Sequence, residues 1–215
     1  MKNLAIVISL VAIFGALLGI VKWRQARRAK SIQALLDQAE KSSGKIATYA
    51  EKEYGPLGST TDEILSHESD DKAGKVLLAL LYRIGQKSAK HGIENLTRTE
   101  RLLPAVSVLD AEVQNGGFDQ YFFNPGSDES ETALEGLKEI GASDAAGLLE
   151  RALAVFPDGK PPTDREKRWK AMDRISSKAK PIWNTLENEF YGLKENISEL
   201  SLAYAKRKRA EITLP

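Results

Sequence analysis

The chain has 215 residues, with 31 Lys and Arg against 30 Asp and Glu, and it contains no cysteine. This length suits one globular domain with additional segments, and a core of ordinary size needs no disulfide or metal to hold it. Without cysteine there is no thiol nucleophile, no Cys-based zinc site and no disulfide framework. The formal charge of +1 hides an uneven distribution, because residues 1–30 carry +6 and the remaining residues carry −5. A generally basic nucleic-acid-binding domain is therefore excluded.

The N-terminal segment has the pattern of a membrane anchor. Residues 4–21, LAIVISLVAIFGALLGIV, contain no charged side chain, and eighteen helical residues span roughly 27 Å, close to the hydrocarbon thickness of a bilayer. Five basic residues follow within 22–30, whereas only Lys2 precedes the stretch. The positive-inside rule then predicts a single-pass membrane protein, with its C-terminal domain in the cytoplasm.

A cleaved signal peptide is the alternative interpretation of this segment. It is less well supported, because its n-region would hold a single Lys and no A-x-A site precedes the basic cluster. Gly15 and Gly19 form a GxxxG pair, a spacing that permits close approach of two membrane helices and is consistent with a homodimer.

Composition divides the chain into four parts. We expect an anchor with its basic flank over 1–30, a juxtamembrane helix and linker over 31–69, an all-helical domain over 70–209, and a short tail over 210–215. Apolar residues at helical spacing predict an all-α fold of about six to eight helices behind the transmembrane helix.

The helices of the main domain follow in chain order. The first begins near Asp70 and carries a broad apolar stripe up to Ile84. A capping box of Thr97 and Glu100 opens the next, which Pro104 should kink or delay. Its apolar side carries Leu102, Val106, Leu109 and Val113. The glycines after Asn115 should end this helix.

Five further helices are expected after the glycines. Asp128 with Glu131 should cap the first, which Gly141 stops, and Ser143 should start the second, which ends near 156–157. Thr163 with Glu166 should cap the third. Pro181 suits the first turn of a separate helix. A last helix carries Ile197, Leu200 and Tyr204.

The stretch NGGFDQYFFN at 115–124 is the most distinctive in the chain. It resembles the NGGFxQYFxN signature of a bacterial domain-of-unknown-function family that includes the C-terminal domain of a DNA-mimic protein. Segments 134–157 and 186–200, the latter LENEFYGLKENISEL, are similar to further parts of that family, so the resemblance covers roughly residues 70–205. The resemblance implies an all-helical domain, a dimer and an acidic surface presented to DNA-binding proteins. It implies no conserved active site.

Two interpretations of the signature are open. In the favoured one it is a structural hinge, a sharp turn followed by aromatic residues at i, i+3 and i+4 spacing. The residues of the hinge are Gly116, Gly117, Phe118, Tyr121 and Phe122. In the other interpretation, polar side chains surround a small pocket that binds a ligand or carries an enzymatic reaction. The residues of that pocket are Asn115, Asp119, Gln120 and Asn124.

The sequence offers little support for catalysis. It contains no GxSxG, P-loop, dinucleotide-binding or HExxH motif. Asp110 and Glu112 diverge around a helix, and the acidic run beside His67 is better explained as a helix N-terminus than as a metal site. We therefore expect no enzymatic activity, no cofactor and no metal.

Acidic residues are concentrated in the middle of the chain. Between Asp110 and Glu150 there are ten acidic residues and one base, Lys138. Three glutamates repeat at i, i+4 and i+8, so that their carboxylates follow one helix face at steps of about 6 Å. We expect an interaction surface formed by Asp128, Glu131, Glu135 and Glu139.

Such a surface would resemble the phosphates of DNA and bind a DNA-binding protein, without contacting nucleic acid itself. An ordinary solvated helix face is the plainer alternative, and the sequence alone favours it.

Overall fold

A computed structural model of the protein describes residues 44, 45, 47–67 and 73–214. The expected anchor at 4–21 and its basic flank lie outside the described residues. Within the described part, no helix is both long and apolar enough to cross a bilayer. Contacts divide the chain into one unit at Met1–Glu53, whose described residues are helical, and a second unit at Tyr54–Pro215.

The second unit consists of helices joined by short turns. Its described residues contain no strand, so the all-α prediction is confirmed for this part of the chain. The elements are η1 (Gly55–Leu57), α2 (Thr61–Leu65), α3 (Ala73–His91), η3 (Ile93–Asn95), α4 (Arg98–Phe123), η4 (Pro125–Glu129), α5 (Ser130–Ile140), α6 (Ser143–Leu153), α7 (Arg165–Tyr191), α8 (Ile197–Arg207) and η5 (Arg209–Glu211).

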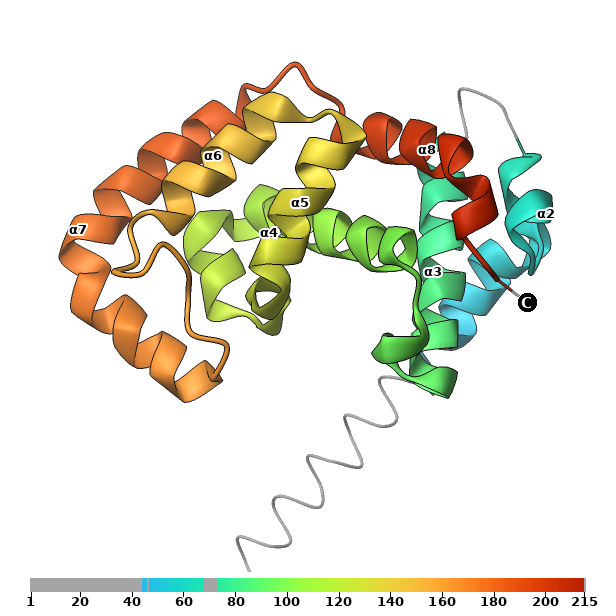
Figure 1. The fold of residues 1–215 in the computed structure, drawn as a ribbon, viewed down its shortest axis with the longest axis horizontal. Helices are drawn as coiled ribbons and strands as arrows, with labels where there is room; N and C mark the ends of the chain where they lie inside the picture. The colour runs from blue at the N-terminus through green and yellow to red at the C-terminus, as the bar shows by residue number, and fades with distance from the viewer. Residues whose placement is uncertain (1–43, 46, 68–72, 215) are drawn as a thin grey trace, which may run out of the picture. The chain divides into compact units, whose positions relative to one another are not determined.

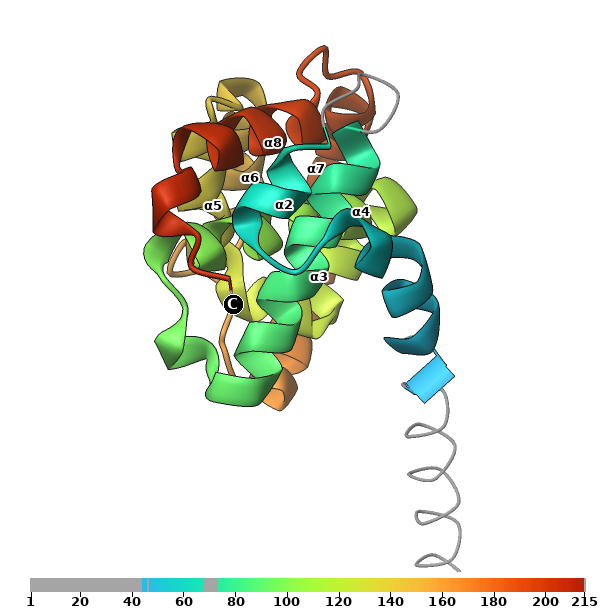
Figure 2. The ribbon, with the colours of Figure 1, turned by 90° about the vertical axis from the view of Figure 1, so that its right-hand side faces the viewer.

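Helix α4 is the element around which the second unit packs (Figure 1). It contacts α5 and α7 most extensively, and it also contacts α3 and α8. Helix α6 lies alongside α7, while α2, α3 and α8 lie together near the C-terminal residues (Figure 2). The apolar stripe expected on α4 is buried along its length, so this side of the helix faces the core.

Two prolines leave their helices continuous where the sequence predicted a break. Helix α4 begins at Arg98, runs through Pro104, and departs from helical dihedral angles further on. Helix α7 contains Pro181 in its interior instead of beginning there. An interior proline removes a backbone hydrogen bond and costs about 3 kcal/mol. Trp183 and Leu186 are 1% exposed, and we attribute the continuous helix to their packing against the core, which outweighs this cost.

The cap of α4 agrees with the sequence prediction. The Glu100 backbone N–H donates to Thr97 Oγ1 at 3.2 Å, and the Thr97 N–H donates to Glu100 Oε2 at 2.9 Å. The expected helix end at Gly141 is also confirmed, because this residue adopts the left-handed conformation with φ 90° and ψ 16°.

Two other expected caps are wrong. Helix α5 begins at Ser130 without a side-chain cap, and Asp128 lies in η4, where an ion pair with Arg168 holds its carboxylate. Helix α7 begins one residue later than expected. Its cap is Asp164, whose carboxylate accepts from the Lys167 N–H at 2.8 Å.

Glu100 also joins α4 to elements that are distant in sequence. Its carboxylate accepts hydrogen bonds from Lys87 Nζ at 2.7 Å and from the Thr213 N–H at 2.7 Å, and its side chain is fully buried. Burial by itself would raise the pKa of Glu100. The Lys87 ammonium and the backbone donors outweigh burial and hold the pKa below its usual value. The ionised carboxylate therefore connects α3, α4 and the C-terminal segment.

Replacing this carboxylate should destabilise the protein in a pH-dependent way. We expect Glu100→Gln to lower the free energy of unfolding by about 3 kcal/mol at pH 7, because Lys87 loses its buried partner. The lowered pKa means that the wild-type contribution is full above the unfolded value and is lost as the pH falls through the folded value. The difference in the free energy of unfolding between wild type and variant should therefore be smaller at pH 3.5 than at pH 7. Denaturant unfolding at the two pH values measures it. Glu135→Gln, which breaks an exposed pair, is the control and should change stability by less than about 1 kcal/mol. A difference that stays constant with pH would contradict this role of Glu100.

Candidate functional site

The signature at 115–124 forms a break in α4. Gly116 has φ −162° and ψ 26°, and Gly117 has φ 75° and ψ −174°, so the helical segment before the pair changes direction into the segment that follows it. Residues with side chains rarely adopt the conformation of Gly117. A Cβ at this position would also overlap the carboxylate of Glu187, which would have to move away. The backbone conformation therefore favours glycine here, and a side chain would also displace the Glu187 carboxylate.

Glu187 of α7 caps the helical segment that begins after the break. The first N–H groups of a helix have no partner within the helix. The Phe118 N–H donates to Glu187 Oε1 at 3.1 Å, and the Asp119 N–H also donates to this carboxylate. Burial and the nearby Asp119 carboxylate raise the pKa of Glu187, against the effect of these donors. No pattern in the sequence marks Glu187 for this role, although it lies in the LENEFYG segment.

The aromatic residues after the break enter the core. Phe118, Tyr121 and Phe122 are fully buried, as their spacing predicted. The Phe122 ring lies 5.0 Å from the Phe156 ring and 5.1 Å from the Trp183 ring, measured between centroids. Aromatic pairs at these distances each contribute roughly 0.5–1.5 kcal/mol beyond burial. The break in α4 therefore places three aromatic side chains in one cluster with α7.

The polar side chains of the signature bind one another. Asn115 Nδ2 donates to Gln120 Oε1 at 3.1 Å, and Gln120 Nε2 donates to Glu112 Oε2 at 2.6 Å. Asn124 Nδ2 donates to the same Glu112 oxygen at 2.8 Å. Asp119 is exposed. The amides that the ligand-pocket interpretation required are engaged in a chain of internal hydrogen bonds centred on Glu112.

Arg168 holds the C-terminal end of α4 and is fully buried. Its guanidinium donates to the Phe122 carbonyl at 2.9 Å and to the Pro162 carbonyl at 2.9 Å. It also forms an ion pair with Asp128. Asp128, which the sequence assigned to an interaction surface, thus helps to hold η4 and the loop before α7. No sequence pattern distinguished Arg168 from an ordinary surface arginine.

The three glutamates of α5 lie on its exposed side. Their side chains are 74% exposed at Glu131, 49% at Glu135 and 36% at Glu139. Arg98 of α4 forms ion pairs with both Glu135 and Glu139, and Lys160 lies 3.3 Å from Glu131. The hydrogen bond from Arg98 holds the pKa of Glu139 below its usual range. The structure therefore contains the expected carboxylate row, with bases from two other segments placed along it.

No group of three or more His, Asp and Glu residues in the described part of the chain is placed to hold a metal ion. A family model described as "DMP19-like protein" matches residues 94–208, which include the signature, Glu187 and the α5 glutamates. No curated protein and no solved structure matches the chain.

The hinge interpretation can be tested at Gly117. We expect Gly117→Ala to lower the free energy of unfolding by about 3 kcal/mol, because a side chain strains the backbone and displaces the Glu187 carboxylate. Asn115→Ala should cost about 1 kcal/mol or less, since it removes one exposed hydrogen bond. Thermal unfolding of both variants measures the difference. Equal stability of Gly117→Ala and wild type would show that the turn is not constrained as described.

Arg168 should be among the most sensitive positions in the chain. We expect Arg168→Met to cost about 3–5 kcal/mol, because it leaves the Phe122 and Pro162 carbonyls and the Asp128 carboxylate without their common donor. Arg165→Met, three residues earlier on the same helix, removes an exposed guanidinium stacked on Trp169 and should cost about 1 kcal/mol or less. Denaturant unfolding compares the two variants, and similar losses would argue against the buried network.

Proposed function

The chain belongs to the DMP19-like protein family, and from this premise we propose that it is a protein-interaction module that binds a basic partner through the carboxylates of α5. The observation that carries the proposal is the exposed row of Glu131, Glu135 and Glu139, one helical turn apart on a single face. Carboxylates at these positions are accessible to a second molecule.

The ion pairs already present along the row can be replaced by ion pairs with a partner. Arg98 and Lys160 are 47% and 60% exposed, so their pairs with the row are solvated. Exposed pairs contribute only about 0–1 kcal/mol each, and opening them costs correspondingly little. Lysines and arginines of a partner can therefore take the places of Arg98 and Lys160. The carboxylates of the row form ion pairs in both the free protein and the complex.

The partner that we propose is a DNA-binding protein. A repeated row of negative charge on a rigid helix presents to a basic groove what the phosphates of a DNA strand present, and binding of either would weaken with salt. The same row repels phosphate, so we propose no direct contact between this domain and nucleic acid. A solvated surface with no partner remains the alternative that the experiment below separates from this proposal.

We also propose that residues 4–21 anchor the chain in the inner membrane with this domain in the cytoplasm. The support is the uncharged stretch and the five bases of 22–30. In this arrangement a DNA-binding partner would be recruited to the membrane surface, and GxxxG pairing of two anchors would present two acidic rows together.

Neutralising the row should abolish binding of the partner. We expect a pull-down from bacterial lysate at about 50 mM salt to retain a DNA-binding protein, and duplex DNA to displace it. Glu131→Gln, Glu135→Gln and Glu139→Gln combined should reduce retention at least tenfold. Arg98→Gln should increase retention, because it removes the cation that competes with the partner for Glu135 and Glu139.

A control variant with the same change of net charge separates the row from general acidity. Glu166→Gln, Asp173→Asn and Glu189→Gln combined remove three exposed charges on α7 and should leave retention within about twofold. If no DNA-binding protein is retained, or if the control and the α5 variant lose retention equally, the proposal is wrong.

A further inference from the structure

The exposed side of helix α7 carries a stripe of basic residues. The stripe consists of Lys167, Lys170, Arg174 and Lys178. These positions are i, i+3, i+7 and i+11, so at about 100° per residue they share about 80° of the helix circumference. All four are exposed, while Met172 and Ala179 on the other side of α7 are buried. Helix α7 forms one edge of the second unit (Figure 1), which leaves the stripe accessible to a large, flat partner.

The stripe is not neutralised by neighbouring carboxylates. Among the residues that the structure describes, no carboxylate lies within ion-pair distance of its four side chains, whereas Arg98, Lys138 and Arg151 all pair with glutamates. Two acids of the same helix, Glu166 and Asp173, border the stripe on one side. Over residues 165–180, six exposed bases against two exposed acids still leave a charge of +4. This helix is therefore a positive surface on a domain that is acidic elsewhere.

An aromatic pair lies beside the N-terminal half of the stripe. The Phe123 ring is stacked on the Trp169 ring at 4.9 Å between centroids, and Phe123 is 49% exposed. The Arg165 guanidinium lies 4.5 Å from the centroid of the Trp169 ring. Trp169 directly precedes Lys170 of the stripe. Exposed tryptophan beside lysine and arginine is typical of surfaces that contact lipid headgroups, because the ring is apolar with a polar edge.

We propose that the basic stripe of α7 docks the domain on a bilayer surface rich in anionic lipid. The inference rests on the anchor proposed for residues 4–21, because residues 22–53 would then tether the second unit to the membrane. A tether raises the effective concentration of the domain at the bilayer, so weak contacts suffice. Each lysine or arginine near an anionic surface favours association about fivefold. Four such bases hold a tethered domain without any binding pocket.

Docking through α7 leaves the acidic row of α5 free. Helices α5 and α7 do not belong to one surface element, since each packs separately against α4 and α6. An anionic bilayer attracts the bases of α7 and repels the glutamates of α5. The two charged helices therefore orient the domain, with α7 toward the lipid and α5 toward a partner.

A spin label on α7 can test this orientation. The chain contains no cysteine, so one introduced cysteine carries a nitroxide specifically. Ser177→Cys places the label on the exposed side of α7, and Ala89→Cys places it on an exposed position of α3, at the other end of the unit (Figure 1). The full chain is inserted in nanodiscs with a nickel-chelating headgroup lipid, which enhances spin relaxation only at labels close to the bilayer.

The lipid composition and the salt concentration should control the result. With about 30% phosphatidylglycerol at about 100 mM salt, we expect the relaxation enhancement at 177 to be about threefold or more above that at 89. The difference should disappear in neutral phosphatidylcholine, or at about 1 M salt, where charges are screened within about 3 Å.

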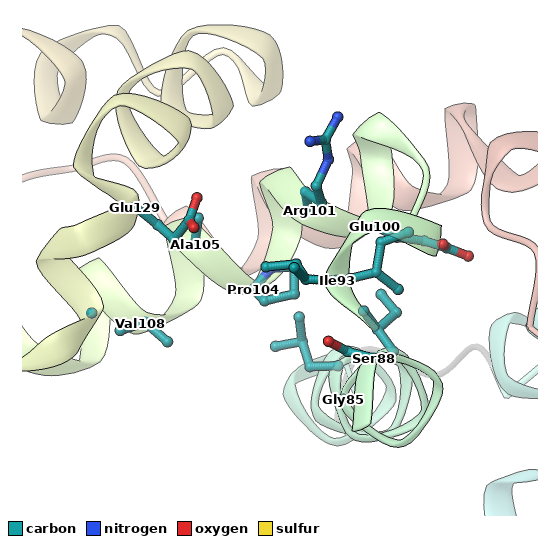
Figure 3. Close-up of a pocket in the computed structure, with 13 residues that line it drawn as sticks. Gly85, Ser88, Ile93, Glu100, Arg101, Pro104, Ala105, Val108 and Glu129 are labelled. Carbon is teal, nitrogen blue, oxygen red and sulfur yellow. The ribbon is translucent and has the colours of Figure 1, made fainter. Parts of the chain in front are cut away.

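Two matched variants separate the stripe from general positive charge. Lys170→Gln with Arg174→Gln removes half of the stripe and should lower the ratio of docked to undocked domain about tenfold or more. Lys90→Gln with Arg101→Gln removes the same charge from exposed positions on α3 and α4 and should leave the ratio within about twofold. The Arg101 guanidinium points away from the apolar groove that α3 and α4 line (Figure 3), so its replacement leaves that groove intact.

The possible failures can be told apart. Release of the chain from nanodiscs by about 1 M salt would contradict the anchor, and with it the docking. An anchored chain with equal enhancement at 177 and 89, or equal losses in the two double variants, would overturn the docking alone. Self-association that Lys170→Gln with Arg174→Gln abolishes would show that the acidic row of a second copy covers the stripe. RNA bound through the stripe, without enhancement on anionic lipid, would identify nucleic acid as the occupant instead.

Discussion

The break in α4 at Gly116 and Gly117 is the constraint on which the rest of the structure depends. A straight helix of this length would carry residues after 117 away from the core, whereas the break turns Phe118 and Phe122 into it. A break within a helix exposes unpaired N–H groups, and the carboxylate of Glu187 provides acceptors for them. The Glu187 carboxylate can approach these N–H groups because Gly117 has no side chain in its way. The glycine pair and Glu187 together form this connection between α4 and α7.

Buried charges hold both ends of the same helix. Glu100 connects the N-terminal end of α4 to α3 and to the C-terminal segment, and Arg168 connects its C-terminal end to η4 and the loop before α7. Burying an ion is costly, and the cost is offset only when most of its hydrogen bonds are made. Each of these two groups makes several. Arg98, the first residue of α4, forms the ion pairs with the glutamates of α5.

The fold and the proposed functions rely on ion pairs of different strength. The pairs at Glu100 and Arg168 include a fully buried partner, and losing them would leave an uncompensated charge in the interior. The pairs along α5 are exposed, so they contribute little to stability and can be exchanged for those of another molecule. A partner that binds at α5, as proposed, would therefore leave the helices beneath it undisturbed.

The sequence by itself determined what depends on neighbouring residues. The all-α class, the Thr97–Glu100 cap and the buried ring spacing of Phe118 to Phe122 follow from helical periodicity and side-chain hydrogen bonds within one turn. Contacts between distant segments were decided only by the tertiary structure. Glu187 reaches Phe118 across 69 positions, and Arg168 reaches Phe122 across 46, so no local pattern marks either residue. Pro181 stayed inside α7 for the same reason, since burial of its neighbours against other helices outweighs a local preference of a few kcal/mol.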